Sequence, residues 1–159
     1  MVITPKRLMM GIPAFLVLIQ LVGPRKTNPP VVPAEGIEAH LKADPEVSRI
    51  LERACRNCHS HQTQWPWYSN VAPVSWFVID NVNFGRRKMN LSTWDQYDRE
   101  ETVHLLEEMC ALVEAGEMPL RPYLWMHEEA RLSEQDVRMI CRWSQGEVRR
   151  VIEGQGGSH

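Results

Sequence analysis

Two cysteines and a histidine lie close together in the segment Cys55-Arg56-Asn57-Cys58-His59. In a helical segment, thiols three residues apart lie on the same face. Both can therefore form thioether bonds with the two vinyl groups along one edge of a porphyrin, and the adjacent imidazole can then bind the iron. C-x-x-C-H is the attachment signature of c-type haem. The segment predicts one covalent haem held by Cys55 and Cys58, with His59 as the proximal iron ligand.

Three other chemistries share parts of this pattern: a zinc site, a thioredoxin-like redox pair and a simple disulfide. Structural zinc needs four ligands, and the chain has no second cysteine pair at zinc spacing, although His61 and a distant histidine would complete a site. A thioredoxin-like pair belongs beside a βαβ unit, and the sequence shows none. With four cysteines and six histidines in the chain, roughly 0.004 chance matches to the motif are expected, which favours haem.

The sixth iron ligand has to come from another part of the chain. Met118 follows a glycine typical of a helix end and precedes a proline, so its thioether is well placed to reach the iron from a loop. Ligation by methionine and histidine raises the reduction potential and suits electron transfer. His127 is the second choice, and an open sixth position is the third. Met126 is a further candidate, whereas His104 is expected on an exposed helix face and His61 lies too close to the proximal histidine.

Aromatic residues follow the motif closely. We expect these aromatic side chains to form walls of a haem pocket or part of the core, because their rings combine a large apolar area with a polar group. They are Trp65, Trp67, Tyr68 and Trp76. Trp67 and Tyr68 are predicted to contact the haem, where an indole N–H or a phenol O–H can donate to a propionate. The basic run at 86–88 fits either propionate partners or a solvated helix end, and we favour the second interpretation.

Cys110 and Cys141 lie on the apolar stripes of two expected helices. In an oxidising compartment they would form a bridge and brace the loop between them, which holds Met118. Two buried thiols fit the sequence equally well, because spacing alone does not show whether the two Cα atoms approach within bonding range.

Three blocks of sequence carry a family resemblance: HSHQTQWPWYSNVAPVSW at 59–76, GEMP at 116–119 and ARLS at 130–133. They resemble the haem-binding domain family of bacterial, membrane-anchored, monohaem c-type cytochromes over most of the chain. The resemblance implies a class I cytochrome c-like fold and assigns the attachment, proximal and distal roles to Cys55, Cys58, His59 and Met118. The chain departs from the family after His127, where a proline is usual.

The elements that must position these residues have the patterns of helices, and strands are hard to find. Each expected helix has start or stop signals, such as an N-cap residue, a proline in the first turn or a glycine after the end. We therefore predict an all-α, cytochrome c-like domain of about four helices around one covalent haem, preceded by a signal-anchor helix. The first helix is expected to start at Asp44-Pro45 and to run into Cys55, and the second to start at Ala72-Pro73 and to end near Gly85. The third is expected to start at Ser92 or Asp98 and to end at Gly116, and the last to start at Ser133 with Asp136.

The N-terminus reads as an export segment. Lys6 and Arg7 precede an apolar run at 8–22, which spans about 22 Å as a helix and falls short of a roughly 30 Å hydrocarbon core. No good small-residue cleavage site follows, so we favour an uncleaved signal anchor over a cleaved peptide. A proline-rich linker at 23–36 would reach about 43 Å and let a domain stand off a membrane. The predicted divisions are 1–24 for the anchor, 25–43 for the linker, 44–153 for the haem domain and 154–159 for a flexible tail.

Charge limits the possible functions. Of 18 basic and 20 acidic residues, four basic and no acidic ones precede residue 27, which leaves 14 basic and 20 acidic side chains beyond it. This excludes a nucleic-acid footprint, and an acidic surface either favours a basic redox partner or serves solubility. We expect a non-enzymatic carrier of single electrons in the bacterial inner membrane, with its haem domain in the periplasm. The alternatives are a fixed haem subunit of a respiratory or photosynthetic complex, and a haem sensor or peroxidase with an open sixth site.

Overall fold

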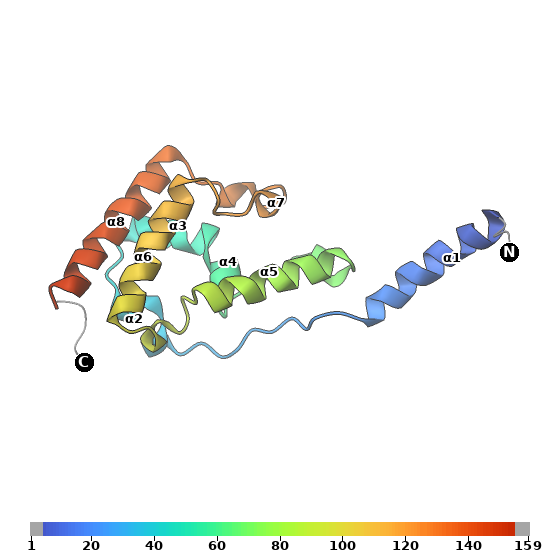
Figure 1. Ribbon diagram of the computed structural model, residues 1–159, viewed down its shortest axis with the longest axis horizontal. Coiled ribbons are helices and arrows are strands. Elements are labelled where there is room, and N and C mark those ends of the chain that lie inside the picture. The colour runs from blue at the N-terminus through green and yellow to red at the C-terminus, as the bar shows by residue number, and fades with distance from the viewer. Residues whose placement is uncertain (1–4, 155–159) are drawn as a thin grey trace.

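The computed structural model describes residues 5–154, and over that range it contains helices, short 3-10 turns and loops but no strand. The predicted all-α class is confirmed. Figure 1 shows α1 (Pro5–Leu18) extending away from a body formed by the other helices. Those helices are α2 (Ile37–His40), α3 (Pro45–Ala54), α4 (Arg56–His59), α5 (Val74–Lys88), α6 (Arg99–Glu114), α7 (Arg121–Leu124) and α8 (Glu134–Ile152).

Local sequence signals explain where the longer helices begin. The Asp44 carboxylate caps α3 by accepting from the backbone N–H groups of Glu46 and Val47, both at 2.9 Å. Of the two predicted caps for α6, Asp98 is the one used, in a capping box. A second capping box formed by Ser133 and Asp136 starts α8. These helices thus begin where the sequence predicts.

Helix α5 extends further than expected. It continues through Gly85 to Lys88, because a glycine inside a helix lowers its stability without ending it. At the end of α6, by contrast, Gly116 has a φ of 67°, the left-handed conformation that glycine adopts at a helix C-terminus. Gly116 therefore turns the chain into the loop that holds Met118.

The core lies between α3, α6, α8 and the segment around Leu91. Figure 1 shows α6 and α8 side by side and antiparallel. The buried Ser144 hydroxyl donates to the Leu106 carbonyl at 2.6 Å, which satisfies a polar group at the centre of this interface.

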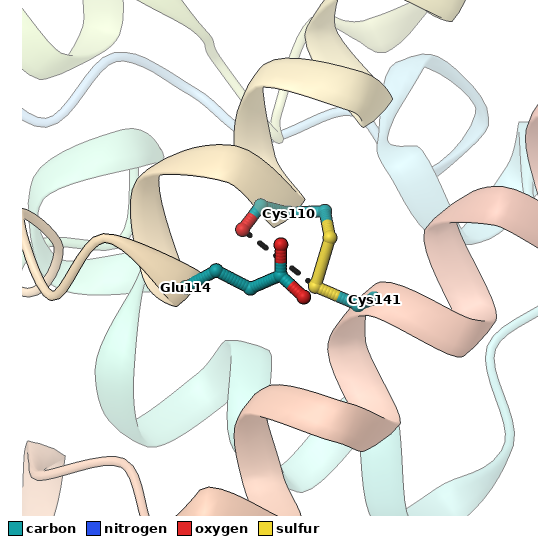
Figure 2. Close-up of side chains that lie close together, drawn as sticks. All are labelled: Cys110, Glu114 and Cys141. Carbon is teal, nitrogen blue, oxygen red and sulfur yellow. Dashed lines mark hydrogen bonds between the residues drawn. A yellow bond between two sulfur atoms is a disulfide. The ribbon is translucent and has the colours of Figure 1, made fainter.

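A disulfide joins the same two helices. Cys110 of α6 and Cys141 of α8 are bonded, with their Cα atoms 4.7 Å apart. Figure 2 shows the bridge with the Glu114 side chain beside it. Of the two states left open by the sequence, the structure therefore has the bridge, and it closes the segment that includes Met118.

Removing this bridge with the double change Cys110→Ala, Cys141→Ala is expected to lower the free energy of unfolding by about 3.5 kcal/mol, from the chain entropy of a loop of this length. Urea denaturation followed by circular dichroism measures the loss. Dithiothreitol should reproduce it in the unmodified chain and should leave the double variant unchanged. Equal denaturation midpoints for the two proteins would show that the bridge adds no stability.

Residues assigned to the linker make extensive contacts with the body. Ile37 and Leu41 are buried in the core, and the Ile37 N–H donates to the Leu91 carbonyl at 2.8 Å. Further upstream, Asn28 donates to the Thr63 carbonyl at 2.8 Å. The linker is extended only up to residue 32 and then forms a 3-10 turn and α2. It follows the surface of the domain instead of forming a free spacer, because groups of the domain satisfy its backbone and polar groups.

In α1, side-chain exposure is described for residues 11–18, and the apolar side chains among them are exposed. Among the helices within residues 5–154, none combines the length and the apolar character needed to cross a bilayer.

Candidate functional site

The C-x-x-C-H segment lies at the junction of two helices. Cys55 is the C-cap of α3, where its N–H donates to the Leu51 carbonyl. The Cys55 carbonyl in turn accepts from the N–H groups of Cys58 and His59 at 3.1 and 3.0 Å. The amphipathic helix α3 packs Val47, Ile50 and Leu51 into the core. The core therefore fixes the start of the motif, and α4 turns its remaining residues away from that core.

The two motif cysteines are free thiols. Burial raises the pKa of Cys55 to about 12, with a further contribution from Cys58. Burial likewise raises the pKa of Cys58 to about 11, although the Arg86 charge opposes the shift. Cysteines of thioredoxin-like redox pairs have lowered pKa values. These opposite shifts argue against the redox alternative.

His59 is oriented by the backbone at the C-terminal end of α5. Its Nδ1 lies 3.0 Å from the Met89 carbonyl, and because a carbonyl only accepts, Nδ1 carries the proton and Nε2 keeps its lone pair. Burial lowers the pKa of His59, while hydrogen bonds to the Met89 and Gly85 backbone oppose the shift. A neutral imidazole fixed in this way is the form that binds a metal.

An apolar pocket of about 220 Å³ opens beside the motif. Cys58 and Asn57 of α4 form one side, and α5 contributes a second wall. The opposite wall comes from the loop that follows Met118. The remaining lining residues are Thr63, Gln64, Pro66, Tyr68, Phe77, Val78, Asn81, Val82, Leu120, Pro122, Tyr123, Trp125, Met126 and His127.

A hydrogen-bonded cluster joins the two sides of this pocket. The Tyr68 hydroxyl lies 2.8 Å from His127 Nε2, and His127 Nδ1 lies 2.9 Å from a Glu129 carboxylate oxygen. Because the carboxylate accepts, Nδ1 donates to it, and in a neutral imidazole Nε2 then accepts from the Tyr68 hydroxyl. Burial raises the pKa of Tyr68. Tyr123 stacks on His127 at 4.2 Å between centroids, and its hydroxyl accepts from Asn57 at 2.9 Å. The loop wall is thus tied to the motif helix.

The predicted site residues have different positions. Cys58 and Tyr68 line the pocket. Cys55 and Met118 pack against the hydrophobic core as partly buried side chains. Trp67 is 72% exposed and, like Cys55, His59 and Met118, is not among the pocket-lining residues.

Among the alternative ligands, only Met126 and His127 line the pocket. His104 is exposed on α6, as expected. His61 is held outside the pocket, where its Nε2 lies 2.9 Å from the Asn90 amide nitrogen.

Sequence reasoning missed the pocket wall on α5. Four pocket-lining residues recur at helical spacing along α5: Phe77, Val78, Asn81 and Val82. Ile79, which does not line the pocket, is buried. An apolar stripe that extends around more than one face of a helix indicates two buried faces, and this signal was available in the sequence.

Contrary to expectation, the Arg86 side chain is not solvated at the end of a helix, and it is not available to pair with a haem propionate. Its guanidinium donates to the carbonyls of Ser60 and Thr27 at 2.7 and 2.8 Å, and to side-chain oxygens of Asn28 and Thr63 at 3.0 and 2.8 Å. These bonds connect the linker, the end of the motif and α5. Arg86 therefore stabilises the position of the motif.

Gly85 allows α5 to approach the motif. A Cβ at this position would lie 2.7 Å from the Cys58 carbonyl oxygen and 3.3 Å from its carbon. Any side chain would push α5 away from α4, and with it the backbone that orients His59. The glycine is thus required by close contact between two backbones.

Gly85→Ala is expected to lower the free energy of unfolding by about 1–3 kcal/mol, the usual cost of overpacking. Urea denaturation of the haem-loaded chain measures the change. Gly146→Ala in α8 is the matched control, because a Cβ there meets nothing within 4 Å and alanine is the better helix former. Equal stability of the Gly85 variant and the unmodified chain would rule out the close-contact explanation.

These observations test whether the residues suit a haem. His59 is a half-buried, neutral imidazole whose Nδ1 is held by a carbonyl, a cysteine of the attachment signature opens into an apolar pocket, and aromatic side chains line the walls. The pocket, at about 220 Å³, is smaller than the roughly 300–1,000 Å³ of typical small-molecule sites, so it would enclose only part of a haem. The residues fit the group.

Comparison with known proteins gives one match. A family model described as a haem-binding domain matches residues 14–146, which is most of the chain. No curated protein and no solved structure matches.

Proposed function

Because the chain belongs to the haem-binding domain family, we propose that it is a monohaem c-type cytochrome that transfers single electrons. Cys55 and Cys58 would hold the haem through thioethers, His59 would bind the iron on one side, and Met118 would bind it on the other. The observation that carries the proposal is the folded C-x-x-C-H segment, in which His59 is oriented and neutral and Cys58 lines an apolar pocket.

The haem would supply a one-electron couple, and the chain would set its surroundings. The Met89 carbonyl holds the imidazole in the tautomer that leaves Nε2 available. Apolar side chains of α5 and of the segment at 120–127 line the pocket. Methionine ligation would keep the potential high, and the loop that holds Met118 is braced by the disulfide.

We also propose that residues 8–22 anchor the chain in a bacterial inner membrane, with the domain in the periplasm. Disulfides persist in oxidising compartments, so the Cys110–Cys141 bridge supports a location outside the cytoplasm. Proposed partners are redox proteins, including membrane electron-transfer complexes.

The Tyr68–His127 hydrogen bond favours a second candidate, a haem with an open sixth site and peroxidase-type or sensory activity. In that case this pair would be positioned to donate and accept protons on the pocket wall.

One set of spectra tests the proposal. The chain is produced with a c-type haem maturation system, and the spectrum is recorded before and after denaturation and after addition of carbon monoxide. We expect haem absorbance that survives denaturation, a low-spin ferric spectrum and reversible one-electron reduction. A high-spin spectrum that shifts with carbon monoxide would favour the second candidate, and absence of haem would contradict both.

A further inference from the structure

The end of the N-terminal segment is fixed to one corner of the domain. The Gln20 side-chain amide pairs with the backbone of Ala72, accepting from its N–H at 2.8 Å and donating to its carbonyl at 3.2 Å. Two residues later, the Val22 carbonyl accepts from Trp76 Nε1 at 2.7 Å. These bonds link residues that are 52 and 54 positions apart and hold the segment beside the N-terminal end of α5 (Figure 1).

Close contact reinforces these bonds. A Cβ on Gly23 would lie 2.5 Å from Trp76 Nε1, so the backbone lies directly against the indole. Lys26 then bonds to the Asn70 side chain. The segment from Gln20 to Lys26 therefore has little conformational freedom between the apolar run and the domain.

Three large apolar side chains are exposed at this corner: Trp67 by 72%, and Val71 and Val74 by 47% each. We call them the corner patch. Val71 lies between Asn70 and Ala72, the two residues that bond to the N-terminal segment. On the N-terminal segment bonded to this corner, Leu21 and Val22 are exposed apolar side chains as well.

We infer that the corner patch rests on the surface of a lipid bilayer, an inference that depends on the membrane anchor proposed above. An apolar run inserted in a bilayer brings the corner to which it is fixed against the headgroups. Tryptophan is enriched at that depth, and the exposed Arg25 and Lys26 match the negative charge of anionic lipids. The domain then lies against the membrane instead of standing off it.

Site-specific fluorescence tests this contact. Val71→Cys is labelled with an environment-sensitive dye on the full, haem-loaded chain, in which thioethers and the disulfide leave no other reactive thiol. The protein is placed in vesicles of equimolar phosphatidylcholine and phosphatidylglycerol, with and without lipids that carry a nitroxide near the headgroup. Val74→Cys repeats the measurement if the first variant does not fold. Phe15→Cys reports on the anchor, and Gln145→Cys on the exposed side of α8 is the control.

We expect the nitroxide to quench the Val71 label about twofold, as for a residue at the boundary of headgroups and acyl chains. The Phe15 label should also be quenched and the Gln145 label should not. Quenching at Phe15 without quenching at Val71 and Val74 would overturn the inference and leave the anchor intact. No quenching at Phe15 would contradict the anchor itself. A Val71 label that is shielded without nitroxide quenching would assign the patch to a protein partner or a second copy, and would also overturn the inference.

Discussion

Replacing both motif cysteines, Cys55→Ser with Cys58→Ser, is expected to abolish covalent haem. Serine keeps the size of the side chain but forms no thioether, so any remaining haem would be held only by the iron ligands His59 and Met118 and by the pocket walls. The haem absorbance that survives denaturation in the unmodified chain should fall to background in the variant. Haem-dependent staining after denaturing electrophoresis measures this directly.

The chain offers a matched control for this change. Cys110→Ala with Cys141→Ala also removes two cysteines, but at a disulfide that is remote in sequence from the motif. That variant should lose stability and keep its covalent haem. Covalent haem that survives the loss of both motif cysteines would show that attachment occurs elsewhere.

Met118→Ala is expected to remove the sixth iron ligand. The spectrum should change from low spin to high spin, carbon monoxide should then bind, and the reduction potential should fall by on the order of 0.1 V or more within the roughly 0.8 V range that axial ligands span. The physical reason is that a thioether stabilises ferrous iron and raises the potential. Optical spectra and a potentiometric titration measure these changes.

Two residues of the same loop serve as controls. Met126→Ala removes a methionine that lines the pocket and is 56% exposed, and it should leave the spectrum unchanged. His127→Gln tests the second candidate ligand, whose two ring nitrogens are both engaged by Tyr68 and Glu129. Loss of the low-spin spectrum in the His127 variant, with its retention in the Met118 variant, would assign the ligand to His127.

Several features were predictable because they depend on neighbours in the sequence. The caps at Asp44, Asp98 and Ser133 each use a backbone group within three residues. The left-handed turn at Gly116 is a property of one glycine after an apolar helix. The C-x-x-C-H segment, which predicts haem attachment, is also contained within five residues. Such short-range signals do not depend on how the rest of the chain packs.

Other features were decided by contacts between distant segments. The sequence left the state of Cys110 and Cys141 open, and the packing of α6 on α8 brings their Cα atoms within bonding range. The linker was expected to be a spacer, but side chains such as Arg86 hold it against the domain.

The sequence by itself determined the all-α class and the helix starts, because each follows from residues close together in the chain, and for the same reason it predicts haem attachment at the motif. Only the tertiary structure decided which side chains meet across the pocket. Tyr68 and His127 are 59 positions apart yet share a hydrogen bond, and Gly85 touches Cys58 only because α5 packs on α4. Spacing along the chain does not encode such approaches, because they depend on how all the helices fill the same space.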